Sequence, residues 1–110
     1  MLVAITGCLG LSGCGREPDR FDQAKTLIAT NCGACHTVPG VTGAAGRVGP
    51  PLTGIGTRQI IAGHFANTPD NLVSWIEHPQ QLLPGDAMPE MGLSHQQAQA
   101  IASYLYTLDN

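Results

Sequence analysis

The feature that constrains this chain most is the run Cys32-Gly33-Ala34-Cys35-His36. Two cysteines separated by two residues and followed directly by histidine form the C-x-x-C-H pattern, which is typical of covalent haem attachment. The spacing has a mechanical reason. Two thiols add to the two haem vinyl groups as thioethers, and the imidazole of the next residue then reaches the iron from the same side. The run therefore predicts one covalent haem c, held by Cys32, Cys35 and His36.

Three other interpretations of these residues fit the sequence less well. A thioredoxin-like redox pair needs a β-α-β setting, and no strand is predicted before the pair. A structural zinc ion needs four ligands, and no second Cys or His cluster of suitable spacing follows. A disulfide between Cys32 and Cys35 leaves His36 without a role. Haem attachment is the interpretation that uses all three side chains.

Length and composition agree with one small domain built around a bound group. The 110 residues suffice for a single core. Aromatic residues make up only 5% of the chain, so few large rings are present to fill that core. Charged residues are 12% and the formal net charge is -3. With no basic run, the chain lacks the electrostatic pattern expected of a nucleic-acid-binding protein.

The first 13 residues are apolar or small, with no charge, and resemble a lipoprotein signal peptide. They end in Leu11-Ser12-Gly13-Cys14, which resembles the bacterial lipoprotein box and predicts acylation of Cys14. A second match ends at Cys8, but it leaves a signal shorter than usual, so Cys14 is preferred. No Lys or Arg precedes the apolar run, which an upstream start site would explain. The alternative is an ordinary cleaved signal that leaves Cys14 as a free thiol.

Residues 14–19 form a short polar tether, and residues 20–110 form the folded domain. Six extended residues reach only about 20 Å, so the tether would hold the domain close to a membrane surface. No apolar stretch approaches the roughly 20 residues that span a bilayer. We therefore expect a periplasmic protein anchored by lipid, on the periplasmic face of the inner membrane.

The apolar pattern after residue 19 predicts an all-α fold. Helices are expected at residues 20–31, 68–78 and 94–108, the last beginning with a Ser94–Gln97 capping box. Strand-like alternation is nearly absent. Residues 37–56 are rich in glycine and proline, and their apolar residues follow neither a helical nor a strand period. A loop this long is unusual inside a compact domain unless it wraps a ligand that supplies part of the core.

The second axial ligand of the iron has to come from elsewhere in the chain. The candidates are Met88, Met91, His64, His78 and His95. Met88 lies in a turn-rich loop between two predicted helices, where a thioether can approach the iron without helical constraint, and Met91 competes with it. His95 and His78 lie at helix ends, and His64 is expected on the surface or near a propionate. Spacing alone leaves a His/His pair open.

The order of motifs resembles the class I (mitochondrial-type) cytochrome c family, in a short bacterial form. The shared order is a helix, C-x-x-C-H, Gly-Pro-x-Leu at residues 49–52, a central helix, Pro-Gly-x-x-Met at residues 84–88 and a capped C-terminal helix. The resemblance covers residues 20–108. It implies the cytochrome c fold, in which three to five helices wrap one covalent haem.

The resemblance also implies roles for individual residues. Met88 matches the axial methionine, and Pro50 matches the proline whose carbonyl accepts the other N–H of His36. Arg58 resembles the arginine near a haem propionate. Trp75 falls where the family often has a tyrosine beside the axial sulfur. Trp75 departs from the family pattern, and a plain core aromatic is an equally good interpretation of it.

The expected function is electron transfer rather than catalysis, because two filled axial positions leave no open iron site. One hypothesis is a membrane-tethered carrier between a quinol-oxidising complex and a terminal oxidase. The alternative is the haem subunit that accepts electrons from a periplasmic dehydrogenase. The family's ring of lysines around the haem edge is missing, since Lys25 is the only lysine. An apolar or weakly polar docking rim is therefore expected.

Overall fold

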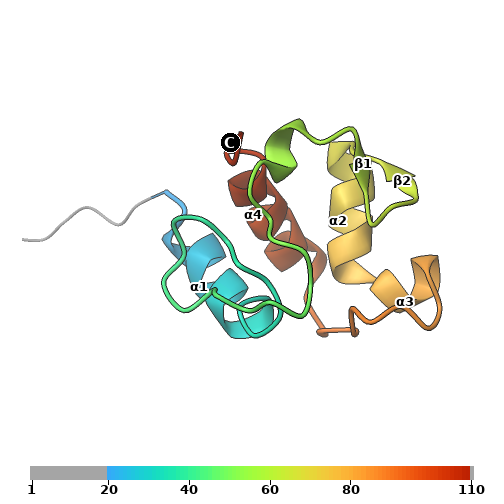
Figure 1. Cartoon of the computed structure of the whole chain (residues 1–110), viewed down its shortest axis with the longest axis horizontal. Helices are drawn as coiled ribbons and strands as arrows, with labels where there is room; N and C mark the ends of the chain where they lie inside the picture. Colours follow the sequence, from blue (N-terminus) through green and yellow to red (C-terminus); the bar gives the residue numbers. More distant parts are fainter. Residues whose placement is uncertain (1–19, 110) are drawn as a thin grey trace, which may run out of the picture.

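The computed structural model describes residues 20–109, so the predicted signal peptide, the tether and Cys14 lie outside the described residues. Figure 1 shows the arrangement of the elements. In chain order they are α1 (Asp22–Asn31), the 3-10 turn η1 (Ile55–Thr57), β1 (Ile60–Ile61), β2 (Phe65–Ala66), α2 (Pro69–Glu77), α3 (Pro79–Leu82) and α4 (His95–Leu105). The fold is mostly helical, as predicted.

Helix α1 leads directly into the C-x-x-C-H run. It carries Asp22 in its first turn, where a carboxylate interacts favourably with the helix dipole. Ala24 and Ile28 are its buried residues. The helix ends at Asn31, and the backbone N–H of Cys32 donates to the carbonyl of Ile28 at 2.8 Å. The first cysteine of the run is therefore the C-cap residue of α1.

Helix α2 begins as predicted and is followed by a short helix that the sequence did not predict. The side chain of Thr68 accepts a hydrogen bond from the N–H of Asn71 at 3.1 Å, and Pro69 occupies the first turn. The helix ends at Glu77, because the residue before Pro79 is disfavoured in helical conformation. The same Pro79 then begins α3, since proline fits the first turn of a helix.

Helix α4 has the predicted capping box but ends earlier than predicted. The Ser94 hydroxyl accepts from the N–H of Gln97 at 3.1 Å, and the Gln97 side chain accepts from the N–H of Ser94 at 2.9 Å. The helix ends at Leu105 rather than near Leu108. The carbonyl of Leu108 instead accepts the N–H of Gly56 at 2.7 Å. The chain end thus leaves the helix to bind the 3-10 turn.

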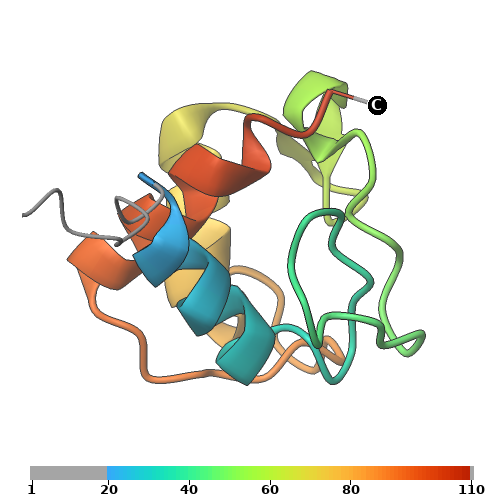
Figure 2. The ribbon, with the colours of Figure 1, turned by 90° about the vertical axis from the view of Figure 1, so that its left-hand side faces the viewer.

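The core forms where α4 packs against α1 on one side and α2 on the other (Figures 1 and 2). Its largest fully buried aliphatic side chains are Ile28, Leu72 and Ile101. Strands β1 and β2 form an antiparallel hairpin, with Ile60 opposite Ala66. Two residues per strand are too few to produce the alternation that predicts strands. Among the described residues, no helix is long and apolar enough to cross a membrane.

Candidate functional site

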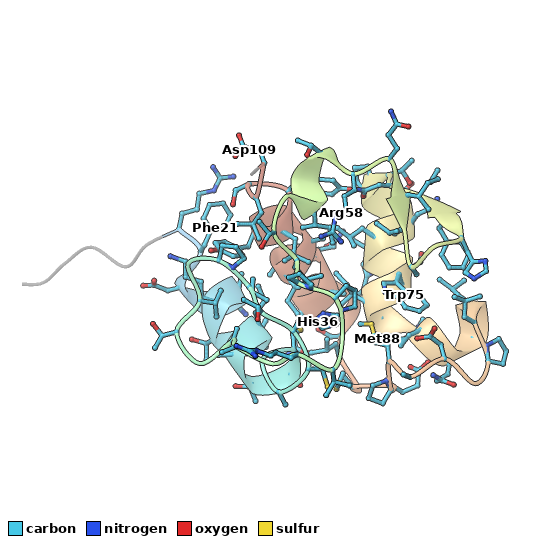
Figure 3. The ribbon with its side chains drawn as sticks, in the orientation of Figure 1. Phe21, His36, Arg58, Trp75, Met88 and Asp109 are labelled. Atoms are coloured by element: carbon cyan, nitrogen blue, oxygen red, sulfur yellow. The ribbon has the colours of Figure 1, made fainter. Side chains whose placement is uncertain are left out.

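A largely apolar cavity of about 470 Å³ lies between the helices and the loop that follows α1. Its size is within the range of small-molecule and cofactor sites. Figure 3 shows His36, Trp75 and Met88 gathered in the middle of the molecule, with Arg58 nearby. The lining includes every predicted haem-site residue: Cys32, Cys35, His36, Pro50, Arg58, Trp75 and Met88. The fold therefore brings together residues that are up to 56 positions apart in the sequence.

A tight turn at the end of α1 places the cysteines and the histidine on one wall of this cavity. The N–H groups of Cys35 and His36 both donate to the carbonyl of Cys32, at 3.1 and 2.9 Å. Gly33 is buried in this turn, where an added Cβ would lie 2.8 Å from the carbonyl oxygen of Ala29. Glycine is thus the residue that fits between the cysteine and the helix backbone.

The imidazole of His36 is held in one orientation. Its Nδ1 lies 2.7 Å from the carbonyl oxygen of Pro50. Because a carbonyl only accepts, Nδ1 carries the proton and Nε2 keeps its lone pair for a metal. Gly49 packs against the ring, where a Cβ would lie 2.8 Å from Nδ1 and 2.9 Å from Nε2. Such a hydrogen bond orients a ligand imidazole and raises its basicity.

The two thiols are free, and their surroundings differ from those of a zinc site or a redox pair. Burial, and then the charge of Cys35, raise the pKa of the Cys32 thiol to about 11. A reactive redox thiol has a lowered pKa instead. Within residues 20–109, no group of three or more His, Cys, Asp or Glu is arranged to hold a metal ion. No strand precedes the pair in that part of the chain. These observations agree with haem attachment.

Both methionine candidates line the cavity, but Met88 is anchored through its backbone on both sides. Its N–H donates to Oδ1 of Asp86 at 3.0 Å, and its carbonyl accepts from Nε2 of Gln80 at 2.7 Å. Met91 is also a lining residue. The three histidine candidates are exposed and do not belong to the lining: His64, His78 and His95. The geometry therefore favours a thioether over a second imidazole.

Arg58 lines the cavity and also fastens the loop beside His36. Its Nη2 donates to the carbonyls of Pro51 at 2.6 Å and Thr53 at 2.9 Å. These bonds hold the guanidinium at the cavity wall. A cation there suits a carboxylate of a bound group.

Asn67 and Tyr106, which were not predicted from the sequence, hold the backbone of Arg58 in place. Asn67 donates from Nδ2 to the carbonyls of Ile55 and Arg58, both at 2.8 Å. The hydroxyl of Tyr106 donates to Oδ1 of Asn67 at 2.8 Å, and burial raises the pKa of this tyrosine, which keeps the donor protonated. Asn67 and Tyr106 are 39 positions apart, and neither belongs to a periodic pattern, so no local signal marked them.

Trp75 is a buried core aromatic, which is one of the two interpretations given to it; its place beside the axial sulfur stays a prediction. It is 9% exposed, belongs to the hydrophobic core and packs on Phe65 with ring centroids 6.0 Å apart. It also lines the cavity. The indole is therefore a core aromatic that forms part of the cavity wall.

Comparison with known proteins agrees with this geometry. A family model for cytochrome c matches residues 21–109, nearly all of the described chain. The chain belongs to the cytochrome c family. Cytochrome c2 from Rhodopila globiformis is 35% identical over 99 residues, which cover 78% of this chain and 91% of that protein. This match, which covers most of both chains, agrees with the class I resemblance of the sequence.

Two further relatives are much longer proteins. Cytochrome c oxidase subunit 2 from Alkalihalophilus pseudofirmus is 36% identical over 103 residues, covering 90% of this chain and 29% of that protein. Cytochrome c oxidase subunit 2 from Bacillus sp. strain PS3 is 29% identical over 90 residues, covering 78% of this chain and 25% of that protein. The chain thus spans between a quarter and a third of the oxidase subunits it matches.

As a cytochrome c, the chain carries covalent haem c, and the cavity fits this group. Cys32 and Cys35 reach the cavity from one turn, as two thioether bonds to one macrocycle require. A preorganised imidazole, a thioether and a guanidinium line the same space. The remaining lining is mostly aliphatic: Val48, Leu52, Ile55, Ile60, Ile61, Leu72, Ile76, Leu93, Ile101 and Leu105. The bound haem supplies an iron that gains and loses one electron.

Gly49→Ala should disturb the haem environment, because its new methyl group would push the His36 imidazole away from the Pro50 carbonyl. Overpacking of this kind costs about 1–3 kcal/mol. We expect a lower urea midpoint and a shifted midpoint potential in redox titration.

Gly43→Ala is the control, because Gly43 has φ +88° but nothing within 4 Å of its added Cβ. It should lose stability through backbone strain alone and keep the wild-type potential. A Gly49→Ala protein with unchanged potential would contradict the role given to the His36–Pro50 hydrogen bond.

Proposed function

We propose that this c-type cytochrome passes single electrons to a terminal oxidase from a quinol-oxidising complex while tethered to the membrane. The observation that carries the proposal is that an oriented imidazole and an anchored thioether line one cavity. Two such side chains would both bind the haem iron and would leave no open site on it for substrate. This supports a carrier rather than an enzyme.

The proposal assigns a role to each haem-site residue. Cys32 and Cys35 would hold the haem through thioether bonds, and His36 Nε2 and the Met88 sulfur would bind its iron. Thioether sulfur raises the reduction potential of haem iron, which suits the late part of a respiratory chain. Pro50 orients the imidazole through its carbonyl.

The two remaining lining residues have supporting roles. Arg58 offers its guanidinium to a haem propionate, and its two carbonyl contacts limit its movement. Trp75 closes the apolar wall. An aromatic wall keeps water from the iron, and low solvent exposure is one of the levers that set the potential of a haem.

The names of the longer relatives support the choice of partner. Two proteins that contain a region similar to this chain are cytochrome c oxidase subunit 2. In those organisms, a region similar to this chain is therefore part of the oxidase subunit itself. We infer that this chain also works beside an oxidase, either as part of it or docked on it.

The surface around the cavity supports docking through apolar contact. Val48 and Ile60 line the cavity yet are 79% and 52% exposed. Apolar side chains this exposed beside a redox centre suit a brief encounter with another protein, which needs only a small interface. With Lys25 as the only lysine and a formal net charge of -3, the chain lacks the ring of lysines that would steer an acidic partner to the haem edge.

The membrane tether rests on the sequence alone. We propose that Cys14 carries the lipid and that residues 14–19 link it to the domain on the periplasmic face of the inner membrane. A single acyl chain gives only marginal binding, so stable anchoring requires more than one chain on Cys14. A short tether would keep the haem close to membrane-embedded partners.

Replacement of Met88 tests the proposed axial ligand. Met88→Ala should abolish the weak far-red sulfur-to-iron absorption of the oxidised protein, lower the midpoint potential and open the iron to small ligands. Met91→Leu is the matched control and should leave all three nearly unchanged. The reversed result would move the ligand to Met91, and no effect from either substitution would point to one of the histidines.

Cys14→Ser tests the tether. The substituted protein should move from the membrane to the soluble periplasmic fraction, because it loses the acylated residue. Each buried methylene of an acyl chain contributes about 0.8 kcal/mol to membrane binding. Fractionation at high salt measures the change. If the variant remains with the membrane, Cys14 is not the anchor or a partner complex holds the protein.

The partner is tested by copurification after mild detergent extraction of the full-length protein. We expect oxidase subunits in the purified complex, and rapid reoxidation of the reduced cytochrome when membranes containing the oxidase are added under oxygen. Reoxidation should stop with cyanide. Copurification with a dehydrogenase, together with reduction by its substrate, would instead establish the alternative role as an electron-accepting subunit.

A further inference from the structure

A set of hydrogen bonds joins α3 to the loop that carries Met88, and Gln80 lies at its centre. The side-chain Nε2 of Gln80 donates to the carbonyls of Asp86 at 2.6 Å and Met88 at 2.7 Å. Its Oε1 accepts the N–H of Gly85 at 3.0 Å. One amide thus binds three backbone groups of the loop, including the carbonyl of the proposed ligand residue itself.

A side chain of the loop also binds the backbone of α3. Oε1 of Glu90 accepts the backbone N–H of Gln80 at 2.9 Å. That N–H belongs to the first turn of α3, where it has no partner within the helix. Gln80 therefore contacts the loop on both sides of Met88, through its side chain on one side and its backbone on the other. The two connections hold the loop over the cavity at both ends.

The side chain that makes these contacts must both donate and accept. An amide offers two N–H donors and a carbonyl acceptor, which match two carbonyls and one N–H of the loop. A carboxylate at this position keeps the acceptor but places negative charge against two carbonyl oxygens. An aliphatic side chain of similar size loses all three bonds. The arrangement is therefore specific to glutamine at position 80.

We propose that Gln80 is a positioning residue that keeps the Met88 loop closed, so that the thioether stays at the haem iron. The proposal rests on the proposed role of Met88 as axial ligand. Gln80 does not touch the iron; it acts through the backbone of the loop. Its chemical effect is to keep the population of the ligand-detached state small.

The detached population can be measured with imidazole as an external ligand of the oxidised haem. Imidazole binds only when Met88 has left the iron, so its apparent affinity is proportional to the detached fraction. A substitution that loosens the loop raises that fraction and tightens imidazole binding. Global destabilisation without loop loosening leaves the affinity unchanged while the protein remains folded.

Gln80→Leu should bind imidazole about tenfold more tightly than the wild-type protein, a change that corresponds to 1.4 kcal/mol. The far-red sulfur-to-iron absorption should persist without imidazole, because Met88 is still present and bound for most of the time. Gln81→Leu is the matched control, since Gln81 lies next in the same helix and is exposed. It should bind imidazole as the wild-type protein does. Equal affinities for the two variants would overturn the proposal.

Two further variants distinguish a failure of the Gln80 proposal from a failure of the Met88 ligand assignment. Gln80→Glu should fold with little change in volume and also bind imidazole more tightly, because a carboxylate cannot donate to the Asp86 and Met88 carbonyls. It keeps the test valid if Gln80→Leu does not fold, and wild-type affinity in it would likewise overturn the proposal. Met88→Ala should lose the far-red absorption. If it keeps that absorption, the ligand assignment is wrong, whatever the result at Gln80.

Discussion

The hydrogen bond between the His36 imidazole and the Pro50 carbonyl is the contact on which the rest of the site depends. It joins the end of α1 to the loop of residues 37–56, which has no regular structure apart from a single bridge between Thr37 and Ala45 and the 3-10 turn at its end. The loop returns to the same turn through its backbone as well. Gly49 donates to the carbonyl of Cys35 at 2.7 Å. The loop also buries Val38, Val41, Ala44 and Ile55 in the hydrophobic core. Its position is therefore set by this packing, by these hydrogen bonds and by the group it encloses.

The sequence was sufficient to predict features that depend on neighbouring residues. The capping box at Ser94, the proline start of α2 and the C-x-x-C-H turn are all local, and the structure has each of them. It was insufficient where one residue serves two elements. Pro79 ends α2 at the residues before it and also begins α3. Helix α4 stops early because a residue beyond it binds the distant Gly56.

The residues of the site show the same division between features predicted from the sequence and features that only the fold revealed. The haem motif followed from its spacing. Loop chemistry favoured Met88, but spacing alone left a His/His pair open, and the preference between two nearby methionines had weaker support. The structure adds the contacts that distinguish them, because Met88 is fastened by Asp86 and Gln80. Asn67 supports Arg58 in a comparable way. Each of these supporting residues is an amide or acid whose partners are set by the folded chain, so residue type alone did not reveal its role.

The two walls of the cavity are stiffened by the same physical means. On one wall a backbone carbonyl fixes an imidazole, and on the other a side-chain amide fixes the backbone beside a thioether. Preorganised groups of this kind need little rearrangement when the charge at the centre of a site changes. An electron carrier gains from this, because its iron alternates between two charges. The irregular loops of this small domain therefore serve to hold His36 and Met88 in place. Helices α1, α2 and α4 provide the frame to which those loops are bound.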